Sequence, residues 1–208
     1  NIKEYPQKLI NIEPDGTKTE FLLYQAKKDT DKMVSLFLKP ESEKDRATLR
    51  LGENMWLYLP EVGRAIRVTS MQSVIGGVFN NSDIMRLDFS TEYNIVSQED
   101  NDNEIILEVK AKNETVAYDK LIMSIDKAST TPKEIKCYSS TDMLIKTLYY
   151  KDLKDFGNGI KRPAVIETDS PFYKGYKSIM VYGKITPKDF KDEAFTLDNL
   201  GKAGELRR

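Results

Sequence analysis

The sequence contains no histidine and only one cysteine, Cys137. Without histidine the chain cannot assemble a Ser-His-Asp or Cys-His catalytic arrangement of its own. One cysteine cannot form a disulfide within the chain, and no CxxC motif or cysteine/histidine cluster is present to hold zinc. Neither the spacing of the acidic residues nor that of the glycines matches an EF-hand, a P-loop or a GxGxxG motif. The sequence therefore offers no enzyme motif and predicts no cofactor and no metal.

Long apolar runs are also missing from the chain. The longest runs, such as residues 21–24 and 33–38, fall far short of the roughly 20 residues that a membrane-spanning helix needs. Residues 1–9 lack the basic and apolar regions of a signal peptide. Because the chain starts abruptly at a strand-like pattern, we interpret it as a secreted protein whose signal peptide has been removed, with no transmembrane segment.

Neither sign of charge is in excess. The 32 lysines and arginines against 33 acidic residues give a formal net charge of -1, which argues against nucleic acid as the main partner. Hydrophobic residues make up 39% and charged residues 31%, a balance typical of a folded chain. All-β domains commonly reach 208 residues, so a single domain over residues 1–208 is predicted.

Period-two alternation of apolar and polar residues dominates the chain and predicts a mainly β fold with short helices. Strands are predicted at residues 8–13, 18–28, 32–39, 46–51, 54–59, 65–69, 93–97, 104–110, 117–126, 134–139, 143–151, 162–168 and 177–185. Their short polar connections favour successive antiparallel hairpins. Ile105, Leu107 and Val109 share one face of their strand, so the sheet has an apolar face that a second sheet, a helix or a ligand must cover.

Residues 70–91 interrupt the alternation. Gly76 and Gly77 are followed by residues 80–83, Asn-Asn-Ser-Asp, a set of N-cap residues that predicts a short helix immediately after them. The segment also has an unusual apolar content for a loop: Met71, Val74, Ile75, Val78, Phe79, Ile84, Met85 and Leu87. We predict that it forms a lid over the apolar face of the sheet.

Several motifs follow one another in a recognisable order. Residues 56–60 read W-x-Y-x-P, an arginine-flanked strand follows at 64–68, and residues 76–83 form a loop with glycine, Phe79 and Asp83. A pair of late strands is expected at residues 118–125 and 132–138, and residues 194–200 contain the pattern F-T-x-x-x-L near the end of the chain. This order resembles the outer-membrane lipoprotein-sorting family, proteins similar to the periplasmic lipoprotein carrier (LolA-like). The resemblance implies an open antiparallel half-barrel, a small helical lid and an apolar cavity for acyl chains.

Two groups of site residues are predicted. The lipid-cavity or lid group is Trp56, Tyr58, Met71, Val78, Phe79, Met85, Leu107 and Met123. Methionines suit a wall that adapts to acyl chains, but ordinary core packing is the first explanation of these apolar residues. The lid-fastening group is Arg64, Arg67 and Asp83, for which solvated surface charges are the alternative.

The favoured function is a non-enzymatic carrier in the periplasm or cell envelope, secreted across the inner membrane. It would bind a lipid or an acylated lipoprotein, for outer-membrane lipoprotein sorting or lipid transport, and the resemblance implies a lipid-exporting membrane transporter as a further partner. The alternative is an envelope sensor or adaptor that binds a protein partner through the same fold.

Overall fold

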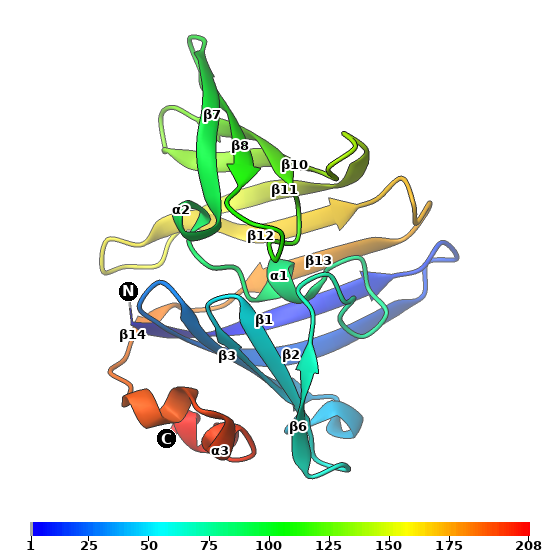
Figure 1. Ribbon diagram of the computed structural model, residues 1–208, viewed down its shortest axis with the longest axis vertical. Helices are drawn as coiled ribbons and strands as arrows, with labels where there is room; N and C mark the ends of the chain where they lie inside the picture. Colours follow the sequence, from blue (N-terminus) through cyan, green and yellow to red (C-terminus); the bar gives the residue numbers. More distant parts are fainter. Residues whose placement is uncertain (1) are drawn as a thin grey trace.

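The computed structural model describes residues 2–208, which form one open antiparallel sheet of 14 strands with a few short helices (Figure 1). The strands are β1 (Lys3–Ile12), β2 (Lys18–Lys28), β3 (Lys32–Lys39), β4 (Ala47–Leu51), β5 (Asn54–Leu59), β6 (Arg64–Val68), β7 (Tyr93–Asp100), β8 (Glu104–Ala111), β9 (Lys120–Asp126), β10 (Thr131–Tyr138), β11 (Leu144–Asp155), β12 (Lys161–Asp169), β13 (Lys177–Tyr182) and β14 (Thr186–Pro187). Their order is β6-β5-β4-β3-β2-β1-β13-β12-β11-β10-β9-β8-β7, with β14 beside β1. The sheet thus consists of two runs of hairpins that meet where β1 pairs with β13.

The predicted mainly β fold and hairpin connections are confirmed, because each predicted strand overlaps an observed one. The largest differences lie at strand ends. β1 begins at Lys3, where Lys3 pairs with Lys27 of β2, and charged residues at this end obscure the apolar alternation. β11 continues to Asp155 as an exposed polar end.

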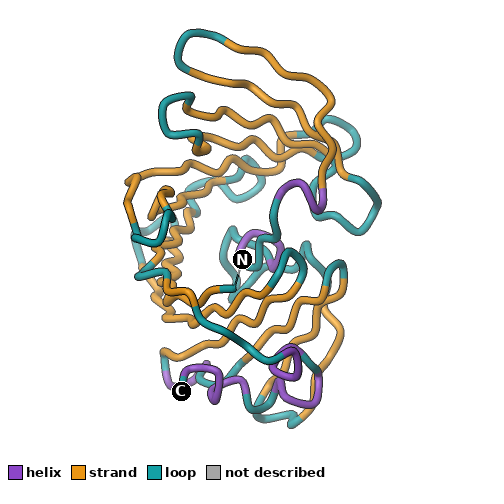
Figure 2. Tube along the Cα trace, turned by 90° about the vertical axis from the view of Figure 1, so that its left-hand side faces the viewer, coloured by secondary structure: helices purple, strands orange, loops and turns teal. Residues whose placement is uncertain are grey.

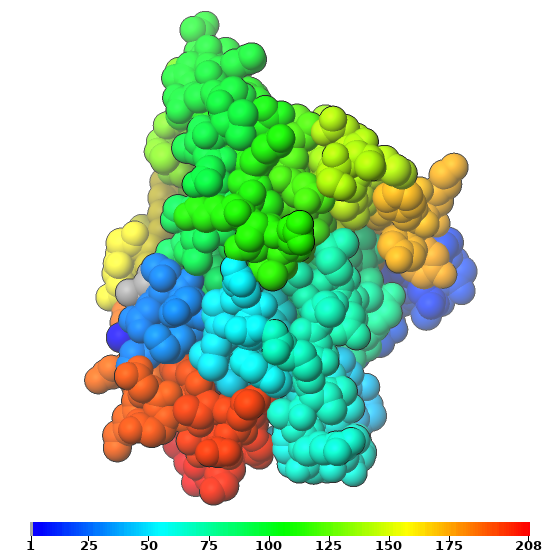
Figure 3. Space-filling model, viewed as in Figure 1, coloured from blue at the N-terminus to red at the C-terminus, as the bar shows by residue number. Residues whose placement is uncertain are grey.

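The sheet is curved and is covered on both faces (Figure 2). Alternate residues of β2 show why: Leu23 packs into the core of the concave face, whereas Tyr24 and Ala26 pack into a second cluster on the convex face. The C-terminal segment covers that second cluster with η2 (Asp192–Phe195), α3 (Leu197–Leu200) and η3 (Ala203–Arg207). In Figure 3 this segment, in orange and red, lies directly against the blue and cyan strands of the N-terminal half.

The connection between β6 and β7, residues 69–92, lies on the concave face, and we call it the lid. It contains two four-residue helices, α1 (Asn81–Ile84) and α2 (Phe89–Glu92). Asn80 caps α1 in a capping box with Asp83, which explains why the helix starts within the predicted N-cap cluster. None of the helices within residues 2–208 has the length and apolar composition needed to cross a membrane.

The lid is packed firmly on the sheet. Phe79 is fully buried and Met85 is 1% exposed, and both belong to the concave core together with Leu9 and Leu121 of the sheet. Burial of these large side chains is the main interaction that holds the lid on the sheet, because the free energy gained is roughly proportional to the apolar area removed from water. The lid as a cover for the apolar face is therefore present in the structure.

Candidate functional site

Arg50 of β4 attaches the lid to the N-terminal half of the sheet. Its Nη1 donates to the carbonyl oxygen of Met85 at 2.8 Å, and its Nε donates to that of Gly52 at 2.9 Å. Its Nη2 forms an ion pair of 2.5 Å with Glu92 in α2, and the two side chains are 4% and 7% exposed. Burial lowers the pKa of Arg50, whereas the charge of Glu92 opposes that shift. One strand residue thus holds both ends of the segment that carries α2.

Asp83 of α1 attaches the lid to the C-terminal half. Its carboxylate accepts hydrogen bonds from Tyr118 Oη and from Lys146 Nζ of β11, both at 2.8 Å. Lys146 Nζ also donates to the carbonyl oxygen of Val78 at 2.6 Å. Burial, followed by the negative charge of Asp83, raises the pKa of Tyr118 well above its usual range, so its hydroxyl remains a donor. These contacts are buried and charge-assisted, the strong class of hydrogen bond.

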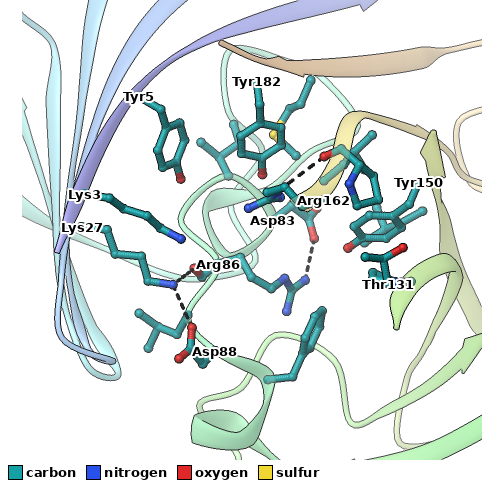
Figure 4. Close-up of a pocket in the computed structure, with 18 residues that line it drawn as sticks. Lys3, Tyr5, Lys27, Asp83, Arg86, Asp88, Thr131, Tyr150, Arg162 and Tyr182 are labelled. Carbon is teal, nitrogen blue, oxygen red and sulfur yellow. Dashed lines mark hydrogen bonds and ion pairs between the residues drawn. The ribbon is translucent and has the colours of Figure 1, made fainter. Parts of the chain in front are cut away.

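A cavity of about 230 Å³ lies between the lid and the concave face (Figure 4). Leu148, Ile166 and Met180 form part of its apolar wall. Its charged and aromatic polar lining consists of Lys3, Tyr5, Lys27, Asp83, Arg86, Asp88, Tyr150, Arg162 and Tyr182. The cavity therefore combines an apolar wall with four cationic side chains and two carboxylates.

The cations in this cavity repel one another. The pKa of Lys3 falls to about 8 because of burial first, and then because of the charges of Lys27 and Arg162. The guanidinium of Arg162 lies 4.1 Å from the centre of the Tyr182 ring. Burial raises the pKa of Tyr5 and of Tyr150, so both phenols stay protonated around neutral pH. The cavity is consequently electropositive and lined by hydroxyl groups that donate hydrogen bonds.

Replacing Lys3 with methionine is expected to stabilise the folded protein. The pKa shift from 10.5 to about 8 corresponds to about 3 kcal/mol, which partial exposure reduces to an expected gain of roughly 1–2 kcal/mol at pH 7. Above pH 8 the folded protein releases this proton while the unfolded chain keeps it up to about 10.5, so wild-type stability should rise across that window. Urea unfolding of wild type and Lys3→Met at pH 7 and pH 9 measures both effects.

Lys18→Met is the matched control, because Lys18 is an exposed lysine at the start of β2. It should leave the free energy of unfolding nearly unchanged at both pH values. A Lys3→Met variant that is no more stable than the Lys18→Met control at pH 7 would show that the cations in the cavity do not strain the fold.

The structure brings part of the predicted cavity or lid group together. Phe79, Met85 and Met123 lie in the concave core, and Leu107 is partly buried against it. Val78 is buried in the lid at 6% exposure. Met71, in contrast, is 48% exposed and lies outside that core.

Trp56 and Tyr58 lie on the other face of the sheet from the lid core. Trp56 pairs with Leu49, and both tryptophan and tyrosine pack against the cluster that the C-terminal segment covers. The ring of Tyr58 is close to Gly201 of that segment. The structure therefore corrects their predicted placement: they line neither the cavity nor the lid, because the register of β5 turns their side chains to the convex face.

The arginines predicted to fasten the lid are also placed elsewhere. Arg64 is exposed at the start of β6, and Arg67 is on the convex face, where its guanidinium lies 5.3 Å from the Trp56 ring. Asp83 contacts neither arginine and instead accepts hydrogen bonds from Lys146 and Tyr118. The fasteners that sequence reasoning missed are Arg50, Lys146 and Lys27, whose Nζ pairs with Asp88 at 3.0 Å. The sequence feature that could have identified them is a charged residue at an inward-facing position of a strand with alternating apolar and polar residues.

Solved structures with high similarity share this fold. A LolA superfamily protein from Nitrosomonas europaea matches with a TM-score of 0.85 and 24% identity over 95% of this chain and 91% of its own. A putative outer membrane lipoprotein-sorting protein domain from Vibrio parahaemolyticus matches with a TM-score of 0.82 and 18% identity over 97% of this chain and 92% of its own. A DUF1329 family protein from Desulfovibrio piger matches with a TM-score of 0.82 and 20% identity over 95% of this chain and 91% of its own.

Comparison of the sequence alone gives a family. A search of curated proteins returns no match. A family model whose description reads "Uncharacterized protein" matches residues 29–202, which is most of the chain. The protein therefore belongs to the family that this model describes, and its fold is LolA-like.

Proposed function

We propose that residues 1–208 form one carrier domain that binds the acyl chains of a lipid or lipoprotein between the lid and the concave face. The observation that carries the proposal is the lid itself: an apolar segment on an apolar sheet, fixed at its edges by Arg50, Lys146 and Lys27. Such a cover can be exchanged for other apolar groups without exposing the sheet to water. No covalent chemistry is required, so the protein acts without being an enzyme.

The lid and an acyl chain stabilise the apolar face of the sheet by comparable free energies. Each large lid side chain contributes roughly 1.5–3 kcal/mol on full burial, and each buried methylene contributes about 0.8 kcal/mol. About ten methylenes of an acyl chain therefore offset the displacement of Phe79, Ile84 and Met85 from the sheet. Near balance favours reversible uptake and release, which a carrier needs, because tight burial alone would trap the cargo.

The fold also supports a place for the protein in the cell. The Vibrio parahaemolyticus structure is named as an outer membrane lipoprotein-sorting protein domain. By analogy, we place this protein in the periplasm or cell envelope, where it would take cargo from a lipid-exporting membrane transporter. Native mass spectrometry of the protein purified from its own envelope, followed by lipid extraction, would identify the cargo. A protein that stays free of acyl species even after incubation with lipids and lipopeptides would contradict the carrier function.

A Phe79→Leu variant is expected to bind acyl chains more tightly than wild type. Phe79 is fully buried in the lid core, so the smaller side chain loses about 1 kcal/mol of lid packing while the sheet keeps its apolar surface. Because lid and cargo compete for one surface, the affinity for a fluorescent fatty acid should rise about fivefold. Titration of the probe, followed by fluorescence, measures the change.

Phe172→Leu is the matched control, since Phe172 is 55% exposed on the outer loop before β13 and should leave the affinity unchanged. Equal affinities for wild type and Phe79→Leu would mean that the lid does not compete with the acyl chain.

A second candidate function is an envelope adaptor that binds a protein partner at a sheet edge. The observation that favours it is β7, an edge strand whose Ile95 and Val96 are 64% and 54% exposed. Unpaired backbone groups and apolar side chains on such an edge suit the addition of a partner strand. Native mass spectra that contain a protein partner and no acyl cargo would favour this function over carriage.

A further inference from the structure

The cavity under the lid collects positive charge from separate parts of the fold. Lys3 comes from β1, Lys27 from β2 and Arg162 from β12, and Arg86 enters from the lid between α1 and α2. Figure 4 shows these side chains directed toward one another around the cavity. Lys3 and Lys27 are direct cross-strand partners in the β1–β2 ladder. Like charges at such a pair destabilise a sheet, and of the two lysines Lys27 alone has a carboxylate partner among the described residues, Asp88.

The carboxylates of the cavity neutralise only part of this positive charge, because Asp88 pairs with Lys27 at 3.0 Å. Asp83 already accepts from Lys146 and Tyr118, and the Nη2 of Arg86 is 3.6 Å from it. Within residues 2–208, that Nη2 is buried without a hydrogen-bond acceptor. Lys3 and Arg162 form no ion pair with any carboxylate in the same described part of the chain. The Nε of Arg162 donates to the carbonyl oxygen of Pro163 at 3.4 Å, which leaves its two Nη groups without a carboxylate partner. Lys3, these Nη groups and the Nη2 of Arg86 are thus the donors that an incoming acceptor can reach.

Oxyanions fit this set of groups. Guanidinium groups match the geometry of phosphate oxygens, and lysine adds a compact charge. The phenols of Tyr5, Tyr150 and Tyr182 line the same space, and they add neutral hydrogen-bond donors. A cavity of about 230 Å³ far exceeds the ~10–15 Å³ that one water requires, so a small oxyanion and several waters can enter.

We propose that this cavity binds the phosphate-type anionic headgroup of an amphiphilic cargo, whose acyl chain lies on the adjoining apolar face. The inference rests on the proposed carrier function and names the class of its cargo. Leu148, Ile166 and Met180 continue the wall of the cavity from the cations into the concave core, so headgroup and chain have adjacent sites. The pKa of Lys3 is lowered by burial first and then by the charges of Lys27 and Arg162, and an anion in the cavity would relieve the second of these causes.

Headgroup binding would also act on the lid. Lys27 Nζ holds the lid through Asp88 at 3.0 Å and the carbonyl oxygen of Arg86 at 3.4 Å. A phosphate in the cavity competes with these acceptors for Lys27, and it draws Arg86 away from Asp83. Binding of the headgroup therefore weakens one attachment of the lid at the moment when the acyl chain needs access to the sheet.

The test compares two probes that share one acyl chain, oleoyl lysophosphatidate and the uncharged monooleoylglycerol. Wild type is expected to bind the phosphate lipid at least tenfold more tightly, with a preference that falls as salt is added. Arg162→Met and Lys3→Met should each lose about tenfold in affinity for lysophosphatidate and leave monooleoylglycerol unchanged. Lys161→Met, an exposed neighbour of Arg162 on β12, should change neither.

The outcomes separate the two proposals. Equal binding of both lipids, unaffected by Arg162→Met and Lys3→Met, overturns the headgroup site and leaves carriage intact. Binding of neither lipid overturns carriage itself. Inorganic phosphate is the third probe: an affinity equal to that of lysophosphatidate would identify a site for a free oxyanion and overturn the lipid assignment. Loss of folding does not explain the expected result, because methionine at Lys3 should raise stability.

Discussion

Arg50→Met is expected to release the lid and to destabilise the protein by about 3–5 kcal/mol. Arg50 joins the carbonyl oxygens of Gly52 and Met85 to the carboxylate of Glu92. Among residues 2–208, Glu92 forms no other ion pair, and it is 6% exposed. The variant therefore leaves an uncompensated charge in the interior, which costs far more than the loss of a surface contact. Urea unfolding gives the free energy, and hydrogen exchange shows whether residues 69–92 lose protection first.

The charge on Glu92 can be tested separately. The double variant Arg50→Met/Glu92→Gln should recover part of the lost stability, because it removes the buried charge of Glu92. It should not recover all of it, because the hydrogen bond to the carbonyl oxygen of Met85 is still missing. Arg64→Met, at an exposed position of β6, is the control and should change stability by less than about 0.5 kcal/mol. Uniform loss of protection across the sheet, with no excess in the lid, would show that Arg50 supports the whole fold rather than the lid.

The strands were predictable because an alternating sequence with one dry face has few other conformations. Residues 32–39 and 54–59 were predicted with the observed bounds of β3 and β5, and the N-cap residues at 80–83 marked α1. In each case the signal is local: a side-chain period, a polar turn or a capping residue. No knowledge of the partner strands is needed for these assignments.

The site was harder because it depends on which face of a strand is inward. Trp56 and Tyr58 lie on a strand that is apolar on both faces, so the sequence does not show which face meets the lid. A register shift of one residue would move every side chain of the strand to the opposite face. Arg50 and Lys146 were missed for a related reason. A charged residue inside an alternating strand is usually solvated, and only the lid carbonyls opposite make it a buried donor.

The cations on the concave face have two roles that the structure separates. Arg50 and Lys146 are fully engaged by lid carbonyls and carboxylates, so their charges are neutralised in the closed state. Lys3 and Arg162 line the cavity and have no such partner among the described residues. Lys27 belongs to both groups, because it lines the cavity and holds Asp88 of the lid. A change at the fasteners should therefore alter lid opening, whereas a change at Lys3 or Arg162 should alter cargo preference.

Asp83→Ala is expected to be the most damaging substitution of a charged side chain in the lid, with a loss of about 4–5 kcal/mol. The Asp83 side chain is completely buried, and it accepts from Lys146, from Tyr118 and from the backbone of Asn80 at the start of α1. Removing it takes away the acceptor of the Asn80 N–H, which is one half of the capping box. It also leaves the Lys146 ammonium inside the protein with the carbonyl oxygen of Val78 as its only hydrogen-bond acceptor among residues 2–208. Urea unfolding at pH 7 measures the loss, and a rise in fatty-acid uptake would report the freed lid.

A second aspartate provides the matched control for burial. Asp142 pairs with Lys120 at 2.7 Å, almost the same separation as the 2.8 Å between Asp83 and Lys146. Its side chain, however, is 76% exposed, so water replaces the lost partner and Asp142→Ala should cost far less stability than Asp83→Ala. Similar losses in the two variants would show that Asp83 does not anchor the lid. A loss confined to Asp83→Ala would mean that the buried contact, rather than the ion pair as such, determines whether the lid stays closed.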